Sequence, residues 1–332
     1  MKTFYWLVKR EFWEHRGSFL WTPVITTGVV LVINILTVIA GEVIGGRHFD
    51  TGMMWQQLAT ANPDDIRKVG ALLDVSALLP CIIVSVVLFF VLYSYCMKSL
   101  SSDRSDRSIL FWKSLPVSDL STVLSKVFSA VIVAPVIAVI VSILGAIGML
   151  LIFGINGAIH GVGFGEVVWG LAHPGRIITS MAGLLPIYMI WMLPCVGWLM
   201  LCSAWSKGKV ARWAIALPIG VGVIITWLGA MTNWFGSNTP LGGATDWFWK
   251  HVVLRILLSL FPGSWANNMH DMASINYSSG SGWHANSFAG DLLSNVGQQY
   301  HLLLTPQFLW GILAGAVMIA IAIWLRRWRT EL

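Results

Sequence analysis

Charged residues are scarce in this chain of 332 residues. Asp, Glu, Lys and Arg make up 11% of the sequence, against roughly 25% in an ordinary soluble domain, whereas hydrophobic residues make up 56%. Its cysteines form no CxxC pair, and we expect all of them to behave as small apolar side chains inside apolar runs: Cys81, Cys96, Cys195 and Cys202. The composition therefore excludes a disulfide framework and a cysteine zinc site, and it places the chain in a lipid bilayer.

Common catalytic motifs are missing as well. The sequence contains no HExxH, no GxSxG and no close His/Asp cluster inside an apolar run. It also lacks the phosphate-binding GxxxxGK[ST] loop, because Gly208-Lys209 is followed by Val210 and the glycine that the motif requires five residues before Gly208 is absent. We therefore expect no enzymatic activity and no cofactor or metal ion bound by this chain. A polytopic membrane enzyme acting on lipid or peptide is the less favoured alternative.

Long apolar runs are abundant. A run of about 20 apolar residues can cross the roughly 30 Å hydrocarbon core as a helix, which satisfies every backbone group within its own segment. A charged residue at the centre of such a helix costs roughly 2.5–3.5 kcal/mol, so runs without charge are informative. We predict an all-α integral membrane protein, a single membrane domain over residues 1–332 with six transmembrane helices at about 19–41, 75–97, 127–153, 179–205, 213–235 and 306–325.

The positive charges indicate an orientation. Six spans put both termini on one side of the membrane, and that side carries fifteen of the 21 Lys and Arg residues. Cytoplasmic loops are enriched in Lys and Arg, so both termini are predicted to be cytoplasmic. The formal charge of +6 then reflects orientation, and no phosphate-binding patch suggests a nucleic-acid partner.

The residues before the first span have the pattern of an amphipathic helix. Phe4, Leu7, Val8 and either Phe12 or Trp13 recur at helical spacing. The charged residues lie mostly on another side: Lys9, Arg10, Glu11, Glu14 and Arg16. We predict a helix over 1–16 that lies in the cytoplasmic interface of the membrane. The alternative is a plain aromatic belt with no further role.

The predicted extracytoplasmic side has one long connection, residues 236–305. A stripe of Phe248, Val252, Ile256 and Leu260 predicts a short interfacial or re-entrant helix, which Pro262 and Gly263 would end. Two carboxylates, Glu42 and Asp74, stand at outer ends of spans. We expect both of these carboxylates to be solvated.

Residues 98–126 connect the second and third spans in the cytoplasm. Asp103 and Asp106 favour the start of a short helix, which must end before Pro116. Ser118 or Asp119 can then cap the helix that enters the third span. The exposed apolar run 109–112 requires either the membrane surface or a protein partner. The residues leave open whether this loop is an interfacial anchor or a docking element with Trp112 or Phe111 as its buried contact.

Two cytoplasmic segments resemble the ABC-2 type permease family, the membrane subunits of ATP-driven exporters. In that family an amino-terminal amphipathic helix carries a sequence like Lys9-Arg10-Glu11. The loop between spans two and three has an Asp-Arg pair, an apolar pair and a "SLP.s...l..K" pattern. The matching residues here are Asp106, Arg107, Leu110, Phe111, Trp112, Lys113, Ser114, Leu115, Pro116, Val117, Ser118 and Lys126.

The resemblance implies a function and partners. Asp106, Arg107, Phe111, Trp112, Lys113, Ser114, Leu115 and Pro116 would form a coupling helix seated in a cytosolic ATP-binding subunit, which itself holds ATP and Mg. The amino-terminal helix, with Lys9, Arg10, Glu11, Phe12 and Trp13, would move with it. A second permease copy or a related chain would complete the translocation path in a bacterial inner membrane, in contact with membrane lipid. A non-transporting scaffold or sensory subunit that docks an ATPase is the alternative, and the long 236–305 stretch departs from the minimal family pattern.

Overall fold

A computed structural model of the chain describes residues 2–44, 63–102, 118–206, 210–234, 241–265, 296–297 and 299–328. These residues are helical or lie in short turns, and no strand occurs among them. The helices are α1 (Lys2–Glu14), α2 (Thr22–Ile44), α4 (Pro63–Lys98), α7 (Asp119–Phe128), α8 (Ala134–Ile159), α9 (Pro174–Trp191), α10 (Leu193–Trp205), α11 (Val210–Trp234), α12 (Leu241–Phe248), α13 (Leu254–Leu258) and α16 (Pro306–Trp328). π-helical turns η1 (Gly17–Trp21), η2 (Ser129–Val133), η3 (Glu166–Leu171) and η4 (Trp249–Val253) and the 3₁₀ turn η5 (Leu302–Leu304) join or precede them.

Five helical stretches are long and apolar enough to cross a membrane: Gly17–Val43, Val69–Lys98, Asp119–Ile159, Val210–Met231 and Pro306–Trp328. The pair α9 and α10 passes the same test only as a unit. The prediction of an all-helical, multi-pass membrane protein is thereby confirmed. The count of six spans stays a prediction, because it requires α9 and α10 to cross as one bent helix.

The bend between α9 and α10 is 43° and has a sequence cause. Pro194 stands in the first turn of α10 and has no N–H to donate to the carbonyl of Ile190 one turn earlier. The fourth predicted run, 179–205, is therefore helical on both sides of a break at Met192 rather than one straight helix.

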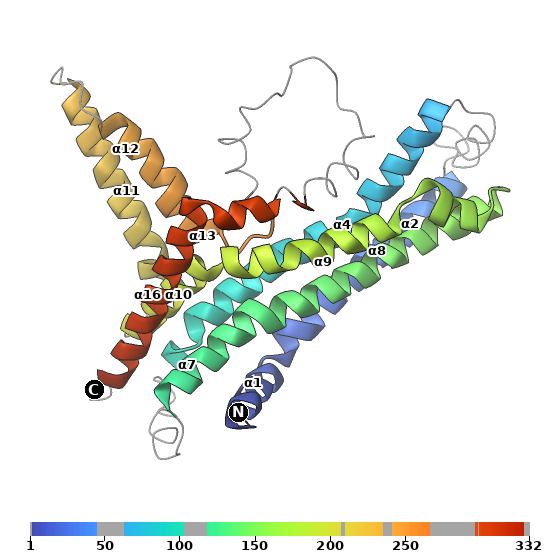
Figure 1. The fold of residues 1–332 in the computed structure, drawn as a ribbon. Helices are drawn as coiled ribbons and strands as arrows, with labels where there is room; N and C mark the ends of the chain where they lie inside the picture. The colour runs from blue at the N-terminus through green and yellow to red at the C-terminus, as the bar shows by residue number, and fades with distance from the viewer. Residues whose placement is uncertain are drawn as a thin grey trace.

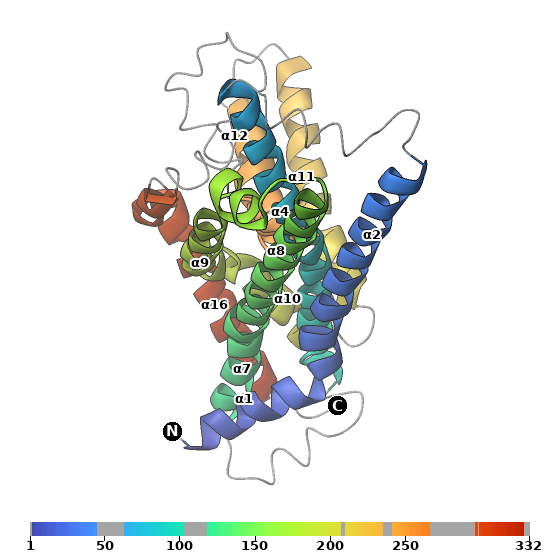
Figure 2. The same cartoon turned by 90° about the vertical axis from the view of Figure 1, so that its right-hand side faces the viewer.

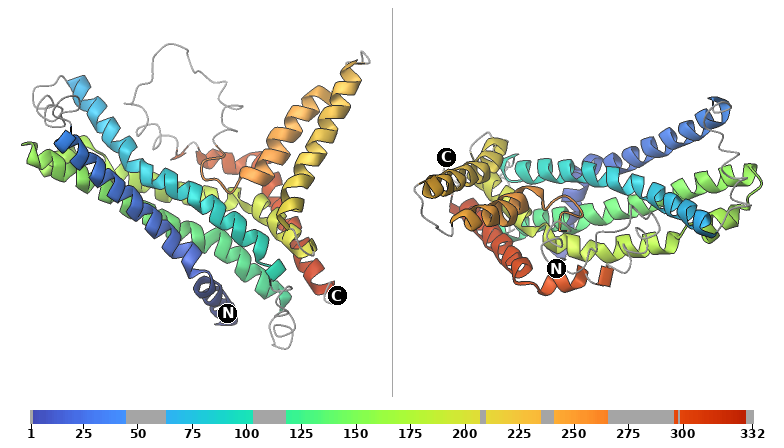
Figure 3. Two further views of the ribbon diagram at one scale, coloured as in Figure 1. Left: turned by 180° about the vertical axis from the view of Figure 1, so that it is seen from behind. Right: turned by 90° about the horizontal axis from the view of Figure 1, so that it is seen from above.

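The helices pack in two groups. α4 lies along α8, with α2 against both, while α10 packs on α16. The amino-terminal α1 and the final turns of α16 lie at the same end of the molecule (Figure 1). Toward the other end, α11 and α12 lie side by side and diverge from α4 (Figure 3). Figure 2 shows α1 lying across the end of the bundle where α7 begins.

One predicted surface group is buried. The expectation that Asp74 is solvated is wrong: Asp74 is only 2% exposed. It accepts a hydrogen bond from the backbone N–H of His173 (2.8 Å), and its other oxygen lies 3.1 Å from His173 Nδ1. Asp74 is four residues after Gly70, which lies against the backbone of Leu171, so both stand on the face of α4 that packs against η3. Glu42 keeps a side chain 38% exposed while pairing with His160 Nε2 at 3.3 Å.

The re-entrant or interfacial helix predicted around Phe248–Leu260 is present as helical structure. It begins earlier than expected, at Leu241, and continues through η4 to Leu258. A turn over 259–265 follows, in which Gly263 has a backbone φ of +88°. Residues other than glycine rarely adopt this backbone conformation. The helix itself ends at Leu258, four residues before Pro262, and the predicted Pro262 and Gly263 lie in the turn that follows.

Small residues allow α10 and α16 to approach closely. A Cβ placed on Gly315 would lie 2.8 Å from the backbone carbon of Leu193 and 3.0 Å from the nitrogen of Pro194. A Cβ on Gly197 would lie 2.7 Å from the Gly315 carbonyl oxygen. Backbone atoms cannot rotate away as a side chain can, so both positions require glycine for this contact.

We predict that Gly315→Leu separates α10 from α16 and destabilises the fold by about 1–3 kcal/mol or more, the usual cost of overpacking. The measurement is the midpoint of thermal unfolding of the purified protein in detergent. Gly220→Leu in α11 is the matched control, because no atom lies within 4 Å of a Cβ there. Equal midpoints for the two variants would contradict the close packing.

Candidate functional site

The candidate site lies where four chain segments meet at one end of the bundle. α4 ends at Lys98, α7 begins at Asp119, α1 crosses beneath them, and α16 ends beside α7 (Figure 2). This end therefore holds the described parts of the loop over 98–126, for which the sequence left open an interfacial anchor or a docking element. Residues 103–117 themselves lie outside the described residues.

A buried ion pair joins α1 to α7. Glu11 Oε1 lies 3.2 Å from Lys126 Nζ, and the two side chains are 2% and 4% exposed. The hydroxyl of Tyr95, near the end of α4, donates to Glu11 Oε2 at 3.1 Å and lies 3.4 Å from the Lys126 carbonyl oxygen. We refer to Glu11, Tyr95 and Lys126 as the Glu11 cluster. Three helices thus converge on one carboxylate, and each of its oxygens has a partner.

Helix periodicity explains why these charges are inside. Glu11 follows the buried Leu7 by four residues and so shares its face of α1. Lys126 belongs to a buried face of α7 that also carries Val123 and Val127. Each charged group stands in an apolar stripe, where only an opposite charge offsets the loss of hydration.

Aromatic rings fix the position of Tyr95. His15 meets its ring edge-on at 4.8 Å between centroids, and Phe19 meets it at 4.9 Å. Phe19 is 1% exposed and belongs to the main apolar core. The hydroxyl of Tyr95 is therefore held toward Glu11 by packing at the junction between α1 and α2.

The start of the 103–117 segment is tied to α10. Ser203 Oγ donates to the Met97 carbonyl oxygen (2.8 Å) and accepts from the backbone N–H groups of Leu100 (3.2 Å) and Ser101 (3.0 Å). Ser99 Oγ lies 3.0 Å from Met200 Sδ. One fully buried hydroxyl therefore satisfies the backbone groups left open where α4 ends.

The other end of the segment is tied to α16. Ser118 caps α7, its hydroxyl accepting from the Ser121 N–H at 3.2 Å, as the sequence predicts. Asp119 Oδ1 accepts a hydrogen bond from Arg326 Nε at 3.2 Å, and the Arg326 side chain is 5% exposed. A carboxylate at a helix amino terminus is favoured by the helix dipole as well as by this pair. The cap stabilises the first turn of α7, and the Asp119–Arg326 pair holds that turn against the last turns of α16.

The predicted residues of the amino-terminal helix take different environments. Glu11 is buried on the same face as Leu7, whereas the charged residues of this helix were expected mostly on another side. Arg10 reaches Glu14 at 3.5 Å and Glu11 at 3.8 Å. Lys9 lies over the Trp6 ring, and Trp13 is 56% exposed beneath Arg16, as expected for an interfacial aromatic. Phe12 is half-buried against the apolar core.

All eight predicted coupling residues lie in 103–117, outside the described residues: Asp106, Arg107, Phe111, Trp112, Lys113, Ser114, Leu115 and Pro116. Sequence reasoning missed Tyr95, Ser203 and the Asp119–Arg326 pair. The sequence did contain a signal for the buried ion pair, since Glu11 and Lys126 each interrupt an apolar helical stripe. Nothing in the local sequence marks Ser203, which is one of many small residues in an apolar run.

Within the described ranges, no group of three or more His, Cys, Asp or Glu side chains could hold a metal ion. No protein-family model matches the chain, and neither a curated protein nor a solved structure matches it.

We predict that the Glu11–Lys126 pair behaves as a coupled unit in stability measurements. Glu11→Gln removes the carboxylate from a buried ammonium, and Lys126→Met does the reverse; each costs about 3–5 kcal/mol. The double variant leaves neither charge inside and regains most of that loss. Thermal unfolding of the four proteins in detergent measures the coupling.

The control is Glu14→Gln on the same helix. Its side chain is 55% exposed and pairs with Arg10 across one turn, so the expected change is about 0–1 kcal/mol. Additive losses in the Glu11/Lys126 double variant would mean that the two side chains do not interact.

Proposed function

We propose that this chain is the permease subunit of an ABC-2 type exporter, which forms the translocation path and takes its energy from separate cytosolic ATP-binding subunits. One observation carries the proposal. The two segments that resemble the family, around Lys9-Arg10-Glu11 and up to Lys126, are joined in space by a buried ion pair, although 115 positions separate the paired residues.

The anchoring of the 103–117 segment supports a mechanical role for it. The residues that precede it are held by Ser203 of α10, and α7, which follows it, is held by Arg326 of α16 and by Glu11 of α1. A displacement imposed on this segment by a bound ATPase would reach α10 through residues 97–101, α16 through Asp119 and α1 through Lys126. Closure of the ATP-binding subunits would thereby shift the helices between two packings.

The apolar composition of the long helices supports placement in a membrane. The stretches over Gly17–Val43 and Pro306–Trp328 are largely exposed along their length, which suits contact with lipid or with a second copy. By the positive-inside bias, the end with the Glu11 cluster and both termini faces the cytoplasm of a bacterium. ATP and Mg would bind the partner subunit.

We predict that Trp112→Ala combined with Arg107→Glu abolishes association with the ATP-binding subunit and leaves membrane insertion unchanged. Trp112 would be the buried anchor of the contact and Arg107 a charge at its rim, so losing both removes packing and reverses an attraction. The measurement is affinity purification of the chain from its native membranes, with detection of a Walker-motif protein in the eluate. Unchanged recovery of that protein by the double variant would contradict the docking role.

The matched control is Trp169→Ala with Arg176→Glu, the same pair of changes at exposed positions of η3 and α9. Association should persist in this variant. Transport into vesicles, assayed with the co-purified complex, then separates an exporter from a non-transporting scaffold: ATP-dependent accumulation supports the former. A complex that hydrolyses ATP while moving nothing would favour the scaffold.

A further inference from the structure

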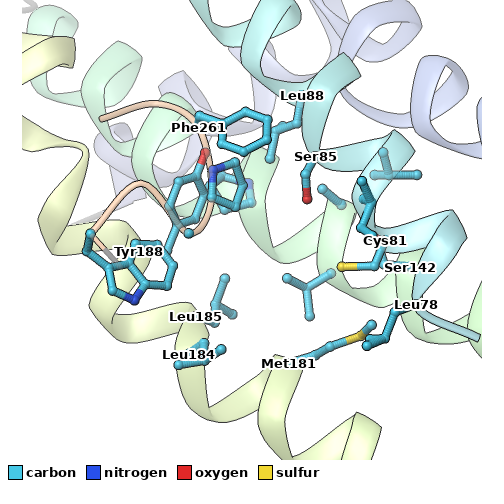
Figure 4. A pocket seen from close by; sticks show the side chains of 18 residues that line it. Leu78, Cys81, Ser85, Leu88, Ser142, Met181, Leu184, Leu185, Tyr188 and Phe261 are labelled. Carbon is cyan, nitrogen blue, oxygen red and sulfur yellow. The ribbon is translucent and has the colours of Figure 1, made fainter. Parts of the chain in front are cut away.

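An apolar cavity of about 300 Å³ lies away from the Glu11 cluster. Its walls come from the middle of α4, from the first turns of α8, from α9, and from the turn that follows α13. Tyr188 and Phe261 face Leu78 and Cys81 across it (Figure 4). Its lining residues span the middle turns of two long membrane-crossing helices, which places the cavity at the depth of the hydrocarbon core.

The lining chemistry excludes charged and strongly polar ligands. None of the 18 lining residues is Asp, Glu, Lys, Arg or His. The Tyr188 hydroxyl is already used, since it donates to the Leu260 carbonyl oxygen at 2.7 Å. The small polar groups of Ser85 and Ser142 lie close enough to Cys81 to interact with its thiol. A cavity of this kind neither attracts water nor coordinates an ion.

One wall is built by hydrogen bonds rather than by loose packing. The turn over 259–265 reverses at Gly263, and Ser264 Oγ accepts from Trp191 Nε1 at 2.9 Å. Trp265 Nε1 donates to Gln299 Oε1 at 2.9 Å. Together with the Tyr188 bond, these contacts hold Phe261 and Trp265 at the cavity edge. The cavity is therefore a feature of the fold, at the lower bound of the roughly 300–1,000 Å³ range of ligand sites.

The cavity reaches the membrane-facing surface. Ile82 lines it and is also 52% exposed on the outside of α4. Protein interiors seldom keep voids larger than a water molecule, because the lining atoms lose dispersion contacts. At this depth of a bilayer, the medium available to fill such a void is hydrocarbon.

From these observations we infer that the cavity is a binding site for one alkyl chain of a lipid or lipid-like amphiphile, which enters sideways past Ile82. The polar head of that molecule stays outside the cavity, because no lining group can pair with it. The inference concerns binding by this chain alone and stands independently of the proposed transport function.

Photolabelling tests the site directly. The full-length protein is reconstituted in nanodiscs with phosphatidylethanolamine that carries a diazirine halfway along one acyl chain, and labelled residues are located by mass spectrometry. A second arm uses the single-chain lysophosphatidylethanolamine with the same diazirine. We expect labels concentrated on the inner wall, at Cys81, Met181 and Tyr188.

Filling the cavity should remove those labels. Ser85→Phe from α4 and Leu185→Trp from α9 each place a ring in the cavity, and each lowers wall labelling by about fivefold or more. Val86→Phe is the matched control: it adds the same ring one residue away, at a position 39% exposed on the outer side of α4, and labelling should persist.

The outcomes are distinct. Labelling of the wall by the phospholipid alone supports a resident bilayer lipid, and labelling chiefly by the single-chain probe supports a smaller amphiphile. Labels spread evenly over the exposed face of α2, or wall labels that persist in both filled variants, would overturn the inference. Photolabelling needs no ATP and no partner subunit, so failure here and failure of the ATPase association are separate results.

Discussion

A buried carboxylate cannot keep its charge without a partner, and this requirement fixes the arrangement of α1. Glu11 meets Lys126 at 3.2 Å in a place where both side chains are almost fully covered. An interfacial helix held by apolar contacts alone could slide or rotate on the bundle. The single charged pair selects one register between α1 and α7, and Tyr95 adds α4 to the same point. The geometry of the loop ends depends on that register.

Much of the fold follows from the sequence because a bilayer leaves an uncharged run few conformations to adopt. Uncharged runs of about 20 residues have few alternatives to a helix, so the long helices coincide with the predicted runs. The local sequence also predicted the cap of α7 at Ser118 and a chain reversal at Gly263, which lies in the turn after α13. The break at Met192 follows from Pro194, although tolerance of proline in membrane helices made one continuous span the simpler expectation.

Contacts between distant segments could not be predicted in the same way. Asp74 was expected in water because it stands near the end of a span, and only the packing of α9 against α4 brings His173 over it. Ser203 has no local signal at all, since its role depends on where α4 ends in space. Glu11 was grouped with the charged residues expected mostly on another side of the helix, while its spacing from Leu7 pointed inward. A charged residue within an apolar helical stripe therefore indicates a buried charge, which the composition of the chain does not reveal.

The central claim is that the Glu11–Lys126 pair holds α1 on the bundle. Hydrogen exchange measured by mass spectrometry in nanodiscs tests this most directly, by comparing residues 2–14 in the wild type and in Lys126→Met. The account predicts slow exchange in the wild type and markedly faster exchange in the variant, although the substitution lies in another helix. Identical exchange of residues 2–14 in the two proteins would contradict it.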